Sequence, residues 1–316
     1  MELRARGMNI ESARRRVSIG SIAVLLFLAA IWGGSIPATK LGLRDFPPLT
    51  LTALRYLVAA PCFLVLLFTR PMPPLRARLA MIAFGVVGVG IGQTCQVLGV
   101  ERTTASVATV ITSIIPILVV LLAALRLGQP LGTRHALGLA AAFLGVGLVA
   151  TGDPRHLSEA LGGDSLVGDA MMIFSAIAIA GYYVLSVELV GRYSAVTVAA
   201  WTSLSGAAAL TPFMLWELQS RSLQLHLQGL GVVLYLALLV TVLGMWIWFW
   251  ALARLPARVA ASLQYLQPLV GVAASALLFA EPLGRWFALG TILVLAGIAL
   301  GTLPARRARD GSFRAE

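Results

Sequence analysis

Long apolar blocks alternate with short polar connections along nearly the whole chain. Each block is roughly 20 residues long, which is enough for a helix to cross the hydrocarbon core of a bilayer. The pattern therefore predicts an all-α polytopic membrane protein with ten transmembrane helices. The predicted helices cover residues 18–37, 49–69, 79–98, 104–126, 133–151, 167–187, 195–215, 228–250, 256–279 and 285–303.

Composition supports this prediction. Of the 316 residues, 59% are hydrophobic and only 12% are charged, and the mean hydropathy is +0.90. A soluble domain carries about a quarter charged residues, so this chain has too few charges to cover a soluble surface. Soluble enzymes are therefore excluded.

We expect the first apolar block to be a retained helix and not a cleaved signal peptide, because it runs through Trp32 and Pro37 to Lys40 without a small-residue cleavage site.

The net charge of +11 follows the membrane pattern. The arginines form short clusters between apolar blocks, whereas nucleic-acid binding needs a basic patch on a folded domain. A cytoplasmic N-terminus and ten helices place 17 of the Lys and Arg residues on the cytoplasmic side and 6 on the other. Since positive charge accumulates in cytoplasmic loops, both termini are predicted to be cytoplasmic.

An internal repeat divides the chain into two halves. Sliding the sequence by 152 positions aligns identical glycines and prolines without a gap, and an offset of 148 aligns the first block with the sixth. We expect a basic N-terminal segment over 1–17, repeats over 18–152 and 165–303, and a basic tail over 304–316. The matched pairs include Gly92 with Gly244, Pro116 with Pro268, Pro130-Leu131-Gly132 with Pro282-Leu283-Gly284, Gly138 with Gly290, and Gly145 with Gly297.

Each repeat holds five predicted helices. Because five is an odd number, the second copy must enter the membrane from the opposite side. Such inverted repeats are typical of transporters, whose substrate sites lie near the bilayer midplane between the two copies. Duplicated halves also occur in channels and structural subunits, so the repeat favours transport without excluding these.

Several short motifs resemble one transporter family. The block Ile31-Trp32-Gly33-Gly34-Ser35 to Lys40, the triplet Leu54-Arg55-Tyr56 and the closing Pro-Leu-Gly elements resemble the drug/metabolite transporter superfamily, in particular the EamA-like exporters. The resemblance covers residues 18–303 and implies a multi-pass carrier of the bacterial inner membrane that exports amino acids or related metabolites. The second copy departs from the motif, having Ala180-Gly181-Tyr182-Tyr183, so the two halves are expected to line the cavity unequally.

Polar side chains inside the predicted helices are the candidate substrate contacts, because burying them in lipid is costly. Gln93 and Gln96 share a helix face. Thr112 precedes Pro116, and its repeat counterparts Gln264 and Tyr265 precede Pro268, next to Gln267. The alternative is that these groups form hydrogen bonds between helices and only hold the bundle together.

Aromatic and basic side chains complete the candidate set. Tyr182, Trp201 and Trp246 lie deep in the predicted helices, although core packing is the alternative for each. Arg55 and Lys40 could hold a substrate carboxylate near the outer mouth, unless they extend to the interface. The predicted substrate-binding residues are Arg55, Gln93, Gln96, Thr112, Tyr182, Trp201, Trp246, Gln264, Tyr265 and Gln267.

No carboxylate lies at the middle of a predicted helix, which disfavours a buried proton switch and favours uniport or exchange. The glycine-rich runs lie inside apolar blocks and are interpreted as packing surfaces, and there is no Walker-type loop for an ATPase.

We expect no cofactor, no metal, no nucleic acid, and a monomer or homodimer that carries a small-molecule substrate in the lipid bilayer. The alternatives are a membrane-embedded enzyme and a non-transporting membrane scaffold. The first would need an interfacial cluster of His, Asp or Glu, and the second an added soluble domain.

Overall fold

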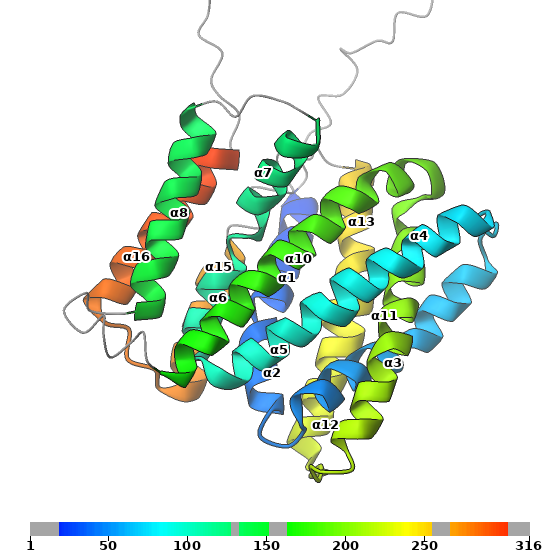
Figure 1. Cartoon of the computed structure of the whole chain (residues 1–316), viewed down its shortest axis with the longest axis horizontal. Helices are drawn as coiled ribbons and strands as arrows, with labels where there is room; N and C mark the ends of the chain where they lie inside the picture. Colours follow the sequence, from blue (N-terminus) through cyan, green and yellow to red (C-terminus); the bar gives the residue numbers. More distant parts are fainter. Residues whose placement is uncertain (1–18, 128–132, 152–162, 255–265, 303–316) are drawn as a thin grey trace, which may run out of the picture.

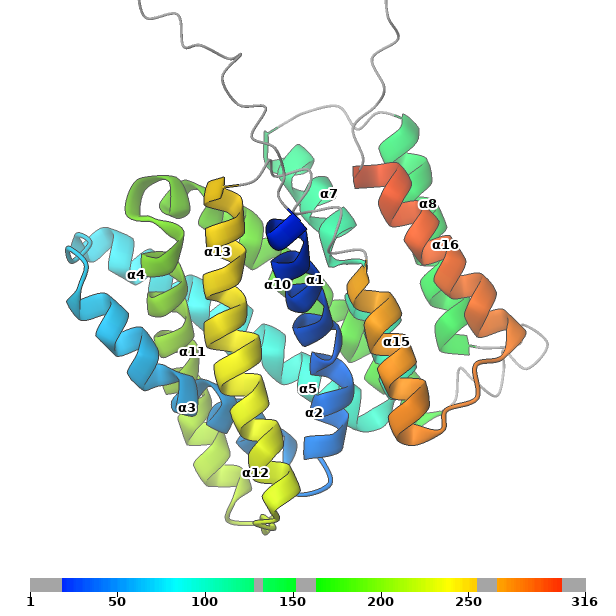
Figure 2. The ribbon, with the colours of Figure 1, turned by 180° about the vertical axis from the view of Figure 1, so that it is seen from behind.

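The computed structural model describes residues 19–127, 133–151, 163–254 and 266–302, and this part of the chain consists of helices joined by turns and loops (Figures 1 and 2). The helices are α1 (Ile19–Gly33), α2 (Ser35–Gly42), α3 (Pro48–Phe68), α4 (Leu75–Gly85), α5 (Gln93–Arg102), α6 (Ala105–Thr112), α7 (Ile115–Leu127), α8 (Thr133–Thr151), α10 (Asp164–Tyr193), α11 (Ala195–Glu217), α12 (Leu227–Leu234), α13 (Gly244–Arg254), α15 (Leu266–Phe279) and α16 (Arg285–Thr302). Two π-helical segments, η1 (Val86–Gly92) and η3 (Tyr235–Leu243), join α4 to α5 and α12 to α13.

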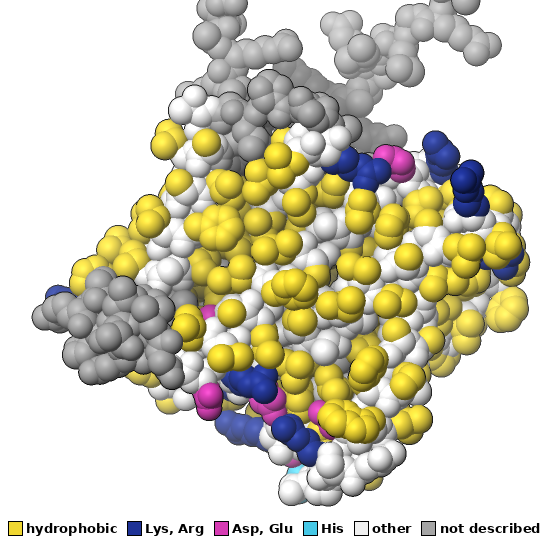
Figure 3. Space-filling model, in the orientation of Figure 1, with side chains coloured by type: hydrophobic (Ala, Val, Ile, Leu, Met, Phe, Trp, Pro, Cys, Tyr) yellow, Lys and Arg dark blue, Asp and Glu magenta, His cyan; other side chains and the backbone are white. Residues whose placement is uncertain are grey.

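Helices occupy the described part of every predicted block. Within the described residues, seven helical stretches are long and apolar enough to cross a membrane, and three apolar helices are shorter. The shorter ones are Ala136–Val149, Leu266–Phe279 and Arg285–Leu300. The protein is therefore an all-helical, multi-pass membrane protein. Figure 3 agrees with this assignment, because hydrophobic side chains cover the middle of the visible face and charged side chains gather along two edges.

Helix boundaries follow local sequence signals. Pro48 stands at the first position of α3, where a missing N–H costs nothing. The Thr104 side chain accepts a hydrogen bond from the N–H of Val107 and so caps α6. The predicted helix over 104–126 is interrupted between Thr112 and Ile115, just before Pro116.

Repeat-matched helices pack against each other. A Cβ atom added to Gly145 in α8 would collide with the backbone of Gly290 in α16, and one added to Gly297 would collide with the carbonyl oxygen of Gly138. Gly138 matches Gly290, and Gly145 matches Gly297, so the contact is reciprocal. Later residues of α8 meet earlier residues of α16, so the two helices run antiparallel, and they lie side by side in Figures 1 and 2. The packing interpretation is confirmed for Gly145.

The π-helical segments lie at nearly matched positions of the two halves. Shifting η1 by 152 positions overlaps most of η3. A π-helical turn is a rare local widening of a helix and is frequent at functional sites. In this protein η1 directly precedes Gln93, and η3 contains Thr241, whose hydroxyl donates to the carbonyl oxygen of Leu236. Both segments adjoin the pocket described next.

Candidate functional site

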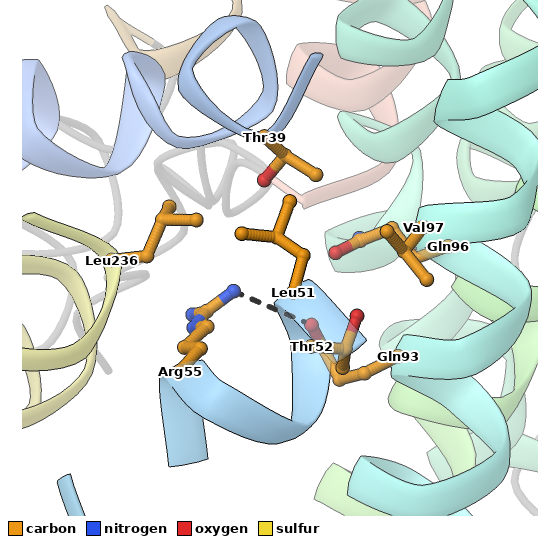
Figure 4. Close-up of a pocket in the computed structure, with 8 residues that line it drawn as sticks. All are labelled: Thr39, Leu51, Thr52, Arg55, Gln93, Gln96, Val97 and Leu236. Carbon is orange, nitrogen blue, oxygen red and sulfur yellow. Dashed lines mark hydrogen bonds between the residues drawn. The ribbon is translucent and has the colours of Figure 1, made fainter. Parts of the chain in front are cut away.

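A small pocket with polar walls lies inside the bundle (Figure 4). Its walls come from α2, α3, α5 and η3, and in this conformation the space between them holds little more than one water molecule. All lining residues except Leu236 belong to the first half of the chain. The lining residues are Thr39, Leu51, Thr52, Arg55, Gln93, Gln96, Val97 and Leu236.

Arg55 brings a positive charge to the pocket from the third turn of α3. Its Nε donates a hydrogen bond to Thr241 Oγ1 at 2.8 Å, and its Nη1 lies 3.5 Å from Gln93 Oε1. The guanidinium carbon also lies 5.4 Å from the centre of the Tyr56 ring. All these partners are neutral. They hold the guanidinium in place but do not neutralise its charge.

Four neutral polar side chains share the pocket with Arg55. Gln93 and Gln96 are one helical turn apart on α5 and both face the cavity. The Thr39 hydroxyl donates to Ser35 O at 2.8 Å, and the Thr52 hydroxyl donates to Pro48 O at 3.1 Å. Since both hydroxyl hydrogens are used within their own helices, the threonine oxygens can act only as acceptors toward a bound solute. The pocket thus offers one cation, two amides and two hydroxyl acceptors.

The Trp32-Gly33-Gly34 element holds the segment that carries Thr241. Trp32 Nε1 donates to the carbonyl oxygen of Val240 at 3.0 Å, and Tyr235 donates from its hydroxyl to Ile31 O at 2.6 Å. A Cβ atom on Gly34 would lie 2.7 Å from the Tyr235 hydroxyl. A larger residue at Gly34 would displace the Tyr235 hydroxyl from its bond to Ile31 O. This motif positions the pocket wall and does not line it.

Three of the predicted site residues come together in the structure. Arg55, Gln93 and Gln96 line the same pocket, as their positions on α3 and α5 require. Sequence reasoning missed Thr39, Thr52 and Thr241. Thr52 lies three residues before Arg55, so a shared helix face could have identified it. Thr39 and Thr241 approach Arg55 only through the tertiary fold.

Four predicted residues lie in other contacts. Thr112 donates its hydroxyl hydrogen to Ala108 O at 2.8 Å. Tyr182 bonds the Thr202 hydroxyl at 3.0 Å, and the Trp201 ring packs against the Ala77, Met81 and Val198 cluster. The Tyr182 and Trp201 contacts, and the Gln267 carbonyl beside Gly33, join neighbouring helices, whereas the Thr112 hydrogen bond lies within α6.

Trp246 lies on the outer surface with 60% of its area exposed, away from the pocket. Three alternating tryptophans spread around a helix, and spacing alone does not say which of them faces lipid. Gln264 and Tyr265 lie outside the described residues.

The Lys40 ammonium group is occupied by hydrogen bonds within the protein. Its Nζ donates to the carbonyl oxygens of Val100, Glu101 and Thr103 at 2.7, 3.0 and 2.7 Å. These carbonyls belong to the end of α5 and the turn that follows, where a helix leaves its last acceptors unpaired. Lys40 is therefore a helix cap, and its assignment to a substrate carboxylate is corrected.

Carboxylates of the described helices lie near helix ends, as expected. The most buried is Asp169 in the second turn of α10, which is only 2% exposed. It contacts the side chain of Thr103, while its Oδ1 has no hydrogen-bond partner among the described residues. The pocket lining contains no carboxylate.

Comparisons with known proteins agree with this geometry. The model of the EamA-like transporter family matches residues 19–151 and again residues 166–303. An uncharacterized transporter from Archaeoglobus fulgidus is 27% identical over 275 residues, which is 87% of this chain and 96% of that protein. A probable amino-acid metabolite efflux pump from Escherichia coli is 24% identical over 300 residues, covering 89% and 94% of the two chains.

A more partial match is a probable terminal-alkyne amino-acid exporter from Streptantibioticus cattleyicolor, 26% identical over 61% of this chain and 64% of that one. Among solved structures, one crystal structure covers 90% of this chain and 97% of its own, with a TM-score of 0.62 and 18% identity. The similarity to this structure supports the fold alone.

Proposed function

Because the chain belongs to the EamA-like transporter family, we propose that it exports small organic solutes, amino acids or related metabolites, from the cytoplasm. The protein is a membrane transporter and not an enzyme. The observation that carries the proposal is the pocket itself. A guanidinium, two amides and two hydroxyl oxygens converge inside an apolar bundle, where burying polar groups is expensive unless they serve a function.

The names of two relatives support this choice of solute. One is called a probable amino-acid metabolite efflux pump and another a probable terminal-alkyne amino-acid exporter. Both names describe outward movement of amino-acid-like molecules. The pocket walls are compatible with such solutes, because they combine a cation with neutral hydrogen-bonding groups.

The proposed mechanism is alternating access between two inverted halves, residues 18–152 and 165–303, with ten transmembrane helices in all. Two observations support it. The family model matches twice, and the repeat-matched helices α8 and α16 run antiparallel, as inversion of one copy requires. Rocking one half against the other would open the pocket to each side of the membrane in turn.

The proposed location is the cell inner membrane, with both termini in the cytoplasm. Arginines collect at the bundle end that holds the last turn of α3 and the first turn of α4, including Arg70, Arg76 and Arg78. The opposite end mixes Lys40 and Arg221 with Glu101 and Glu217. Since cytoplasmic surfaces carry the positive excess, the arginine-rich end is assigned to the cytoplasm.

The experiment is solute counterflow in liposomes that contain the purified protein and no nucleotide. Vesicles are loaded with one unlabelled amino acid, and entry of the same labelled amino acid is followed for each of the twenty common ones. The proposal predicts transient accumulation of at least one of them above the level of protein-free vesicles. The absence of accumulation for every amino acid would contradict it.

A further inference from the structure

Arg55 is a charged residue inside a membrane-spanning helix without a carboxylate partner in the described part of the chain. A buried or half-buried ion in such a helix normally pairs with an opposite charge. The contacts of Arg55 are instead Thr241, Gln93 and the Tyr56 ring, all of them uncharged. These hydrogen bonds use Nε and Nη1 only. The pocket therefore carries one uncompensated positive charge.

No acid of the described helices lines the pocket, and all of them except Asp164 contact other groups. Asp45 contacts His226, Glu101 contacts Arg221, Glu188 contacts Arg126, Glu217 and Glu281 bind helix N-termini, Asp169 lies against Thr103, and Asp164 begins α10. The remaining acids, Glu2, Glu11, Asp153, Glu159, Asp310 and Glu316, fall outside every predicted helix.

Among common functional groups, a carboxylate is the best partner for the unpaired charge of Arg55. The planar guanidinium presents two parallel N–H donors to a carboxylate, and such pairs are stronger than neutral hydrogen bonds. An ammonium group finds no anion in the described lining. The threonine oxygens and glutamine Oε1 atoms are neutral acceptors, which take a hydrogen bond from an amino group or from a hydroxyl group alike.

Building on the proposed transport function, we infer that the pocket selects its solute through the carboxylate, with Arg55 as the specificity-determining residue, and does not require the amino group. Amino acids and the corresponding 2-hydroxy acids should be carried alike. Amides and amines of the same size should be rejected. The recognised class is thus small organic acids with polar substituents, of which amino acids are one part.

The test compares matched competitors of one carried amino acid, chosen as the best substrate in the counterflow experiment. For leucine the competitors are 2-hydroxy-4-methylpentanoate, leucinamide and 3-methylbutylamine, each measured by its concentration for half-inhibition. The hydroxy acid should compete within about threefold of leucine, and the amide and amine at least about tenfold more weakly, because a site built to bind a charged group rejects analogues that lack it. Amide or amine competing as well as the acid would overturn the inference.

Substitutions test the role of Arg55 separately from folding. Arg55→Gln should reduce the preference for acid over amide from at least about tenfold to about twofold, and Arg55→Lys should retain part of it as a point charge. Thr241→Val removes the bond at Nε but keeps the charge, so it should retain the preference. The contradicting result is that Arg55→Gln retains the preference for acid over amide while Thr241→Val loses it. Arg55 would then have only a structural role.

Arg126→Gln is the matched control, since it removes an exposed arginine far from the pocket lining. It should leave the acid preference unchanged. The two proposals can fail separately. If no amino acid gives counterflow, the transport function is wrong, whereas counterflow with equal competition by acid, amide and amine contradicts only the carboxylate inference.

Discussion

The carboxylate of Glu217 accepts a hydrogen bond from the backbone N–H of Thr50 at 2.7 Å and thereby joins the end of α11 to the beginning of α3. The same oxygen accepts the Thr50 hydroxyl at 2.9 Å, and the other oxygen lies 3.3 Å from the N–H of Leu49. Both Glu217 and Thr50 are buried. A carboxylate is favoured there because the N-terminus of a helix carries a partial positive charge.

Replacing Glu217 by Gln should destabilise the bundle. The amide keeps one acceptor but loses the charge, and its amino group faces N–H donors. We expect a loss of about 1.5–3 kcal/mol, the range for hydrogen bonds to charged groups. Thermal unfolding of the detergent-solubilised protein measures it.

Glu188→Gln is the control for this prediction. Its carboxylate pairs with Arg126 at 2.7 Å, but the side chains are 64% and 37% exposed. Exposed pairs contribute about 0–1 kcal/mol. Equal destabilisation by the two variants would contradict the cap at α3.

Lys40→Met should lower stability and leave solute preference intact. The ammonium satisfies three carbonyl oxygens where α5 ends, and methionine leaves them without a donor. Unfolding temperature and counterflow per folded molecule are measured on the same preparation. A changed acid preference with unchanged stability would return Lys40 to the substrate site.

Gly145→Ala should be harmful, whereas Gly147→Ala in the same helix should be tolerated. A methyl group at Gly145 would meet the backbone of Gly290, while one at Gly147 meets no atom within 4 Å. Close helix packing in membranes depends on such small residues. Thermal unfolding of both variants distinguishes the two positions, and equal effects would argue against the α8–α16 contact.

Gln96→Leu should weaken solute binding by about 1–3 kcal/mol, the cost of leaving a buried polar partner unsatisfied. The apparent KM for counterflow measures the effect. Gln228→Leu on the exposed start of α12 makes the same change outside the pocket and should leave KM unchanged. If stability falls with Gln96→Leu while transport per folded molecule persists, the amide is structural.

The hydrophobic pattern predicted most of the fold because each helix must hide its own backbone from lipid. Blocks bounded by prolines, glycines and charges left little choice of helix position, although the break after Thr112 was not predicted. The π-helical segments were not predicted, because the glycine-rich Val86–Gly92 was interpreted only as a packing surface and Tyr235–Leu243 is typical of an ordinary apolar helix. Their form depends on tertiary partners such as Trp32, which bonds the Val240 carbonyl.

The candidate site was only partly predictable for the same reason. Arg55, Gln93 and Gln96 could be identified, because charges and amides are rare and costly within apolar helices. Threonines are cheap there, since their hydroxyls bond the preceding turn, so Thr39 and Thr52 gave no signal. Trp246 was misplaced toward the cavity, because its depth was readable from sequence but its facing direction was not.

The central claim, that one pocket is exposed alternately to both sides of the membrane, is tested most directly by labelling a cysteine within it. Cys62 and Cys95, the free cysteines of the described residues, are first replaced by Ala, and Thr39→Cys is introduced in the pocket wall. Oriented proteoliposomes are then treated with a membrane-impermeant thiol reagent on one side at a time. The account predicts labelling from either side and slower labelling from both when a carried solute is present. Labelling from one side only, or labelling that the solute leaves unchanged, would contradict it.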